Sequence, residues 1–137
     1  MFESISVSKR HLVAITLSMF AALLFLATPV PAAETPQQQL ERAETLSAEA
    51  TVKATLALET GDLALAQEAQ ALAAEAAEIV STVADIAADT GDTALAQAAL
   101  NASVGVGEAT NIIVGAAETI AATSTDTATV EAATALA

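Results

Sequence analysis

Cysteine, tryptophan and tyrosine are absent from this chain of 137 residues, and its only histidine, His11, lies near the N-terminus. The three phenylalanines, Phe2, Phe20 and Phe25, and both methionines also precede residue 26. The rest of the chain therefore has no Cys–His or Ser–His nucleophile and no zinc site of the usual kind. Only carboxylates, hydroxyls and Lys53 remain for catalysis, so we expect no enzyme and no cofactor. Without disulfides, an exported domain must also fold by helix propensity and packing alone.

Basic residues are scarce, since the chain has 4 Lys and Arg against 17 Asp and Glu. The only basic residues beyond residue 32 are Arg42 and Lys53. All the acidic residues except Glu3 also lie beyond residue 32. The net charge of residues 33–137 is therefore 2 minus 16, or −14. Sixteen carboxylates repel phosphate, which argues against nucleic acid as a partner and disfavours anionic membrane surfaces. We expect the partner to be a second copy or another protein, bound through helix packing.

The first 32 residues have the order of a secretory signal peptide. Lys9 and Arg10 precede an uncharged run over 12–26, and prolines and small residues follow it. Val30 and Ala32 fit the two small-residue positions of a cleavage site, so we predict cleavage after Ala32. A run of 15 residues is short for a membrane span of about 20. These features predict an exported protein, periplasmic or extracellular; the alternative is an uncleaved leader that tethers it to the membrane.

Alanine supplies 32 of the 105 residues beyond the predicted leader. It is the best helix former, although burying a methyl group contributes only about 0.8 kcal/mol, against about 1.5–3 for Leu or Ile. Thr35, Pro36 and Gln38 fit a helix start with a capping box. The sequence therefore predicts a single all-α domain over 33–137, an Ala-rich antiparallel helical bundle or hairpin array. Three long helices, about 36–59, 63–89 and 93–122, and a short C-terminal one are expected. Gly105–Gly107 predicts a kink in the third.

An internal repeat marks the two predicted turns. Residues 59–69 and 89–99 are identical at eight of eleven positions, at a spacing of 30. In each copy a glycine can end one helix in the left-handed conformation, and the following aspartate can cap the next helix. Such a stop followed at once by a start reverses the chain into an αα-hairpin. The predicted helix-turn residues are Gly61, Asp62, Gly91 and Asp92.

Large apolar residues recur every seven positions around the second predicted helix, as in a coiled coil. A small or β-branched residue lies four positions after some of them, which would let neighbouring helices approach closely. The predicted packing seam comprises Leu58, Leu65, Leu72, Ile79, Ile86, Ala69, Ala76 and Val83. Glu78, Asp85 and Asp89 lie on the opposite side of this helix. We interpret them as a solvated face, since the DxDxDG loop of a specific calcium site is absent.

These features favour a non-enzymatic exported module with a structural or protein-interaction role, able to self-associate. One alternative is an acidic protein of the cell envelope that binds cations or cationic ligands. A second is an amphipathic protein associated with a lipid or polymer surface, although the lack of aromatic anchors and the acidic charge argue against it.

Overall fold

The computed structural model describes residues 33–137, so the predicted signal peptide, residues 1–32, lies outside the described residues. Within the described part every regular element is an α-helix, which confirms the all-α prediction. The helices are α2 (Pro36–Thr60), α3 (Leu63–Thr90), α4 (Thr93–Thr123) and α5 (Thr127–Leu136). Residues Glu34–Ala137 form one compact unit.

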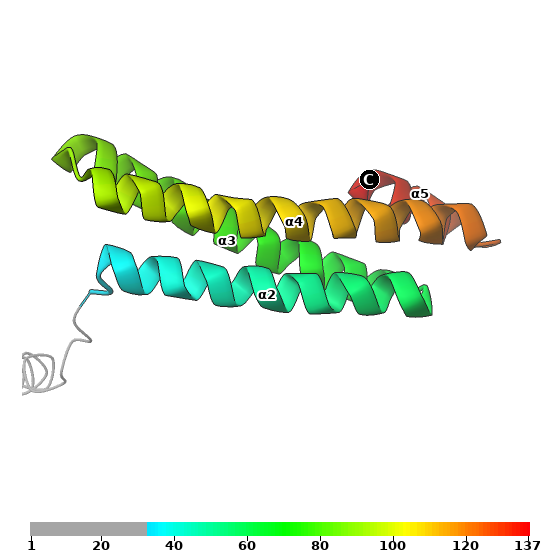
Figure 1. The fold of residues 1–137 in the computed structure, drawn as a ribbon. Coiled ribbons are helices and arrows are strands. Elements are labelled where there is room, and N and C mark those ends of the chain that lie inside the picture. The colour runs from blue at the N-terminus through cyan, green and yellow to red at the C-terminus, as the bar shows by residue number, and fades with distance from the viewer. Residues whose placement is uncertain (1–32) are drawn as a thin grey trace, which may run out of the picture. The chain divides into compact units, whose positions relative to one another are not determined.

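The three long helices form an up–down–up bundle (Figure 1). Helix α3 runs back along α2, and α4 returns beside both, so α2 and α4 point the same way. The short α5 packs mainly on α4 and also contacts α3. With 28 residues at about 1.5 Å each, α3 is about 42 Å long. The bundle is therefore a rod three helices thick, with α5 attached near one end.

The start of α2 is a capping box. The Thr35 side chain accepts a hydrogen bond from the amide of Gln38 at 3.2 Å, and the Gln38 side chain accepts one from the amide of Thr35 at 3.0 Å. Pro36 occupies the first helical position, where its missing N–H costs nothing. This confirms the predicted helix start.

Tight caps at the repeat join the long helices. Gly61 and Gly91 end α2 and α3 in the left-handed conformation, with φ of 70° and 68°. Asp62 and Asp92 then cap α3 and α4, each accepting a hydrogen bond at 2.9 Å from an amide in the first turn. Each helix therefore stops and the next one starts within two residues, which makes consecutive helices antiparallel.

Alanine forms most of the buried interior. In α2 and α3 the buried positions are spaced alternately three and four residues apart, the pattern of the two core positions of a coiled coil. In α2 they are Leu40, Ala43, Ser47, Ala50, Ala54 and Ala57. In α3 they are Ala66, Ala69, Ala73, Ala76, Val80, Val83 and Ala87. Because these side chains are short, the helices pack with their backbones close together.

The interior consists of three layers along the bundle. The layer near the Gly91 turn holds the larger side chains Val83 and Leu95. In the middle layer Ile113 is the only buried side chain larger than alanine. The layer near the Gly61 turn combines Ile120 with Ala133 of α5. The middle of the bundle therefore depends on close methyl packing rather than on large side chains.

The predicted seam differs from the observed one. Its alanines and valine, Ala69, Ala76 and Val83, are buried as expected of a seam. Its large members Leu65, Leu72, Ile79 and Ile86 are only half-buried, and Leu58 lies on α2 with 42% of its surface exposed. The second buried row of α3 is Ala66, Ala73, Val80 and Ala87, one position further along. The large side chains flank the alanine row because the closely packed helices leave no room for them between their axes.

Helix α4 passes through Gly105 and Gly107 without interruption, so the glycine pair does not divide it. Glycine costs a helix about 1 kcal/mol relative to alanine, which is why the sequence predicts a kink there. Gly105 faces α2, and a Cβ built on it would lie 3.7 Å from the Cβ of Ser47. Packing against α2 therefore outweighs the low helix propensity.

Candidate functional site

Most serine and threonine hydroxyls of the long helices donate hydrogen bonds within their own helix. Buried Ser47 donates to the carbonyl oxygen of Ala43 at 2.8 Å, and Ser103 donates to that of Leu100 at 2.6 Å. Several threonines donate in the same way to the carbonyl four residues back. These hydroxyls satisfy helix carbonyls, and no basic side chain bonds to any of them in these helices.

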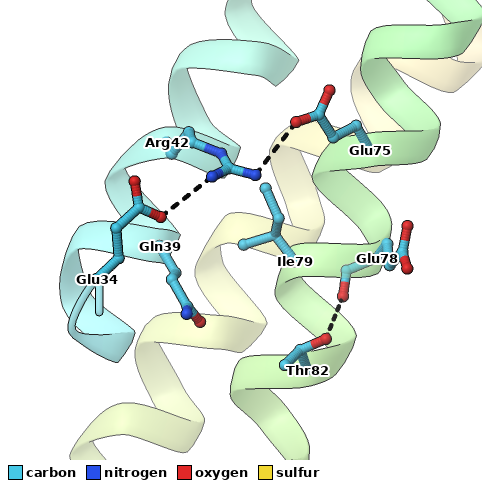
Figure 2. Close-up of a pocket in the computed structure, with 7 residues that line it drawn as sticks. All are labelled: Glu34, Gln39, Arg42, Glu75, Glu78, Ile79 and Thr82. Carbon is cyan, nitrogen blue, oxygen red and sulfur yellow. Dashed lines mark hydrogen bonds and ion pairs between the residues drawn. The ribbon is translucent and has the colours of Figure 1, made fainter. Parts of the chain in front are cut away.

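Arg42 links the beginning of the bundle to α3 (Figure 2). Its Nη1 lies 3.1 Å from Oε2 of Glu34, and its Nη2 lies 3.2 Å from Oε1 of Glu75. All three side chains are about half exposed, so each ion pair stabilises the fold by no more than about 1 kcal/mol. The guanidinium therefore spans the groove between α2 and α3 and neutralises charge on both sides of it.

Lys53 makes the second link between α2 and α3. Its Nζ donates a hydrogen bond to Oε2 of Glu68 at 2.7 Å. This hydrogen bond, together with the negative charges of Glu68 and Glu49, raises the pKa of Lys53 above its usual value. A lysine that activates a serine must lose its proton, and a raised pKa opposes that loss. Lys53 is therefore placed to join helices rather than to act as a base.

A hollow of about 350 Å³ lies in the α2–α3 groove, and Figure 2 shows the side chains that line it. It is lined by Glu34, Gln39, Arg42, Glu75, Glu78, Ile79 and Thr82. Gln39 reaches into the space between the helices, and its Oε1 is buried without a hydrogen-bond partner. Arg42 already pairs with two of the three carboxylates. Across residues 33–137 no three or more His, Cys, Asp or Glu are grouped to hold a metal ion.

Exposed apolar side chains lie on two of the helices. On α2 they are Val52, Leu56 and Leu58, with exposed fractions of 67%, 43% and 42%. On α4 they are Leu100 and Val104, with 59% and 58%. Leu100 and Val104 are four residues apart and therefore share one side of α4. None of these five belonged to a site predicted from the sequence except Leu58, which was assigned to the seam.

The predicted helix-turn residues do not come together. Gly61 and Asp62 lie at one end of the bundle, and Gly91 and Asp92 at the other, because consecutive turns of an up–down–up bundle alternate between its ends (Figure 1). The seam residues are spread along the rod. The residues singled out from the sequence therefore build the scaffold rather than one localised site.

Sequence reasoning missed the two ion pairs that join α2 to α3. A usable signal exists, since Glu68 and Glu75 are seven residues apart and so share one row of α3. Arg42 and Lys53 are the only basic residues of this region and face that row. Pairing them required the antiparallel register, which the Gly61 turn sets.

Within residues 33–137, none of the helices combines the length and the hydropathy that a membrane span requires. Comparison with protein-family models, with curated proteins and with solved structures found no match to this chain.

Proposed function

We propose that this protein is an exported structural or protein-interaction module that acts by packing a helical face against a protein partner. In this proposal it is not an enzyme and binds no nucleic acid. The observation that supports it is the uneven distribution of charge around the bundle. Two of the three grooves between the long helices are acidic, and the third carries no carboxylate.

The acidic grooves both involve α2. In the α2–α3 groove, Glu49, Glu68 and Glu75 surround Lys53. In the α2–α4 groove, Glu44 and Glu108 lie on either side of a hollow of about 350 Å³. Contact at either groove would bring carboxylates into an interface.

The α3–α4 groove differs. On the side of α3 that faces α4, two rows of residues lie next to the buried rows. These two rows contain only Ala, Gln, Ser and Leu. The corresponding rows of α4 contain only Ala, Leu, Ser, Thr, Gly and Val. We call the uncovered part of this surface the α3–α4 face; it is formed by Ala77, Ser81 and Ala84 of α3 and Leu100 and Gly107 of α4, and Val104 borders it. An uncharged face with exposed Leu100, bordered by exposed Val104, on an acidic protein is typical of an interaction surface.

The alternative function, binding of cations or cationic ligands, would reside in the α2–α3 groove of Figure 2. Arg42 competes for Glu34 and Glu75 there, which favours the interaction module over this alternative. Titration calorimetry with calcium and with spermidine distinguishes the two. Heat that saturates with spermidine and disappears in Glu75→Gln would support the ligand-binding function instead.

Export by the leader is part of the proposal, and the mature N-terminus tests it. We expect mass spectrometry of the protein from the envelope or medium to find a chain that begins at Ala33. A chain retaining Met1 in the membrane fraction would show that the leader is a tether instead.

The interaction itself is tested by photo-cross-linking in the producing cell. A photoreactive residue is introduced at Val104, beside Leu100 at the edge of the α3–α4 face, or at Ala71, an exposed position of α3 on another side. We expect a protein adduct from position 104 and a weaker adduct or none from position 71. Absence of a protein adduct at position 104, or equal adducts at both positions, would contradict the proposal.

A further inference from the structure

We propose that helix α5 is a displaceable lid over one end of the α3–α4 groove, and that a helix of a partner protein takes its place there. This inference rests on the proposed function, because it concerns how the partner gains access to the same groove. It commits to a helix of another protein as the occupant, with alanine at its closest contact.

Helix α5 is attached to the bundle by a small apolar contact. Of its 10 residues only Ala133 is buried, whereas each of the long helices buries at least six. Val130 and Leu136 are half-buried beside it. Across the described part of the chain, no hydrogen bond or ion pair joins an α5 side chain to another helix, since the polar side chains of α5 bond only within residues 124–137. Release of α5 therefore breaks no side-chain polar interaction with the bundle.

The length of α5 makes its docking and its folding one event. A helix of 10 residues is too short to persist alone in water. When α5 leaves the groove, residues 124–137 therefore unfold, while the three long helices keep the layers that they form without α5. A segment with few buried apolar contacts opens at a much lower free energy than the whole fold. We expect this open state to be populated at about 0.1–10%.

The groove beneath α5 is already shaped for a helix. Ala133 packs in one buried layer with Ala66 of α3 and Ile120 of α4, whose exposed fractions are 0% and 2%. Leu136, at the end of α5, lines a hollow of about 180 Å³, and the residues that line this hollow are Gln, Ala, Val, Thr, Ile and Leu. Ala77 belongs both to this hollow and to the α3–α4 face. The site of α5, the hollow and the α3–α4 face therefore form one continuous groove.

The length of this groove explains why a partner needs the site of α5. Leu136 and Val106 line the same hollow, so the uncovered stretch of α4 is residues 93–106, about 21 Å long. With a width of about 20 Å, it would bury roughly 420 Å² per partner, less than the roughly 600 Å² of the smallest specific interfaces. Once α5 has left, the groove is about 40 Å long and buries roughly 800 Å² per partner, the standard size.

Helix α5 itself shows which helix this site accepts. Ala133 is 0% exposed, so the residue at the closest contact must be small. Val130 and Leu136 lie three residues before and after it and are half-buried on the same side of α5. Glu131 is exposed. The partner helix therefore carries an alanine with an apolar residue three positions before it and another three positions after it, and no carboxylate on that side.

Thiol labelling of the protein recovered after expression of the full chain tests whether α5 opens locally. The chain has no cysteine, so one introduced thiol reports on one position. Ala133→Cys places the thiol beneath α5, Ala69→Cys places it between the long helices, and Ala135→Cys exposes it on α5. With a maleimide, position 133 should react about 10–1,000-fold more slowly than position 135 and at least about 100-fold faster than position 69.

Two results of this labelling would overturn the lid. Equal rates at positions 133 and 69 would mean that α5 opens only when the whole bundle unfolds. Equal rates at positions 133 and 135 would mean that α5 does not cover the groove.

Thr134→Pro and Thr127→Pro form a matched pair that tests displacement by the partner. Both threonines are exposed, so neither substitution alters the buried contact of α5. Thr134 lies inside α5, where proline breaks the helix, whereas Thr127 is its first residue, where proline is tolerated. The backbone of Asp126 is extended, with φ of −90° and ψ of 121°, as a residue before proline requires.

Photo-cross-linking at position 104 in the producing cell is then compared between these variants. Thr134→Pro should increase the protein adduct about 10-fold, because the apparent dissociation constant falls as the fraction of open molecules rises. Thr127→Pro should leave the adduct at the wild-type level. Circular dichroism at 222 nm should show that both variants retain the long helices. If Thr134→Pro does not fold, the labelling rates, measured with α5 intact, decide whether the lid opens.

The outcomes separate this inference from the proposed function. A protein adduct that is equal in Thr134→Pro and the wild type overturns the lid and leaves the interaction module standing. If no variant gives an adduct, both proposals fail. An adduct between two copies of this chain would overturn the commitment to a helix of another protein.

Discussion

Glycine has two roles in this chain, and the backbone angle at each position distinguishes them. Gly91 has φ of 68° and ends α3, where a side chain of L configuration would be strained. Gly115 lies inside α4 with ordinary helical geometry, and a Cβ built there would meet nothing within 4 Å. The first glycine is required by conformation, whereas the second one only lowers helix stability.

Substitution of these two glycines by alanine should therefore have opposite effects. Gly91→Ala should lower the free energy of unfolding by about 1 kcal/mol, because alanine disfavours the left-handed region. Gly115→Ala should raise it by about 0.5–1 kcal/mol, because the unfolded chain loses freedom and the helix is favoured. Urea denaturation followed by circular dichroism at 222 nm measures both. The same sign for the two variants would contradict this explanation.

In the middle of the bundle the long helices associate through rows of buried alanines. In the middle layer, Ala50 and Ala54 of α2 meet Ala69 and Ala73 of α3 and Ala109 of α4, and all are buried. Interiors at native density have no space for additional methylene groups. A side chain larger than alanine therefore does not fit at any of these positions without displacing its neighbours.

Ala69→Leu should lower the free energy of unfolding by about 1–3 kcal/mol through overpacking, although leucine adds apolar surface. Ala71→Leu is the control on the same helix, since Ala71 is exposed and leucine is nearly as good a helix former. It should change stability by less than about 0.5 kcal/mol. Thermal and urea unfolding of the two variants make the comparison. A stabilising Ala69→Leu would show that the alanine layer contains unfilled space.

Helix α5 depends on its N-cap. The Asp126 carboxylate accepts hydrogen bonds from Oγ1 and N of Thr129 at 2.7 Å and 3.0 Å. These bonds lower the pKa of Asp126 below its ordinary value of 3.8. The folded state therefore holds the proton of Asp126 less tightly than the unfolded state does. The contribution of this carboxylate to stability is complete above pH 3.8, and it is lost as the pH falls through the lower pKa of the folded state.

Hydrogen exchange of the α5 amides should therefore accelerate below pH 3.8, relative to α3, in the wild type. In Asp126→Asn the cap is retained without a titrating group, so this relative change should be absent. Mass spectrometry of α5 and α3 peptides, corrected for intrinsic exchange rates, follows both. An identical pH response in the two proteins would assign the effect to another group.

The sequence predicted helix ends well and the interior poorly, for physical reasons. Ends depend on local signals, such as Gly61 followed by Asp62, and the predicted ends lie within one residue of those in the structure. The interior depends on which alanines face inward, and alanine is equally frequent on exposed surfaces. The large residues Leu72 and Ile79 therefore dominated the predicted pattern, although they flank the core. The α3–α4 face required the arrangement of helices to become visible.

At the scale of the whole molecule, charge opposes folding. Residues 33–137 have 16 acidic and two basic side chains, and both basic ones are already paired across the α2–α3 groove. Their pairs are exposed and contribute little. Repulsion among the remaining carboxylates is therefore the larger electrostatic effect in the native state.

Salt should consequently stabilise the bundle. Raising sodium chloride from about 0.01 M to about 1 M shortens the screening length from about 30 Å to about 3 Å. We expect the melting temperature to rise by about 5 °C, since relief of repulsion exceeds the loss of ion pairing. Circular dichroism at 222 nm measures the melting curve. A lower melting temperature in high salt would show that the ion pairs of Arg42 and Lys53 dominate instead.

The alanine interior also determines how stability depends on temperature. Unfolding exposes mainly methyl groups and backbone here, with few large apolar side chains. Exposure of apolar surface raises the heat capacity, and exposure of polar surface lowers it. The heat-capacity change of unfolding should therefore fall below the usual value of about 12–15 cal/mol/K per residue. A small increment flattens the curve of stability against temperature. The bundle therefore loses little stability on cooling, and cold unfolding is displaced to lower temperatures.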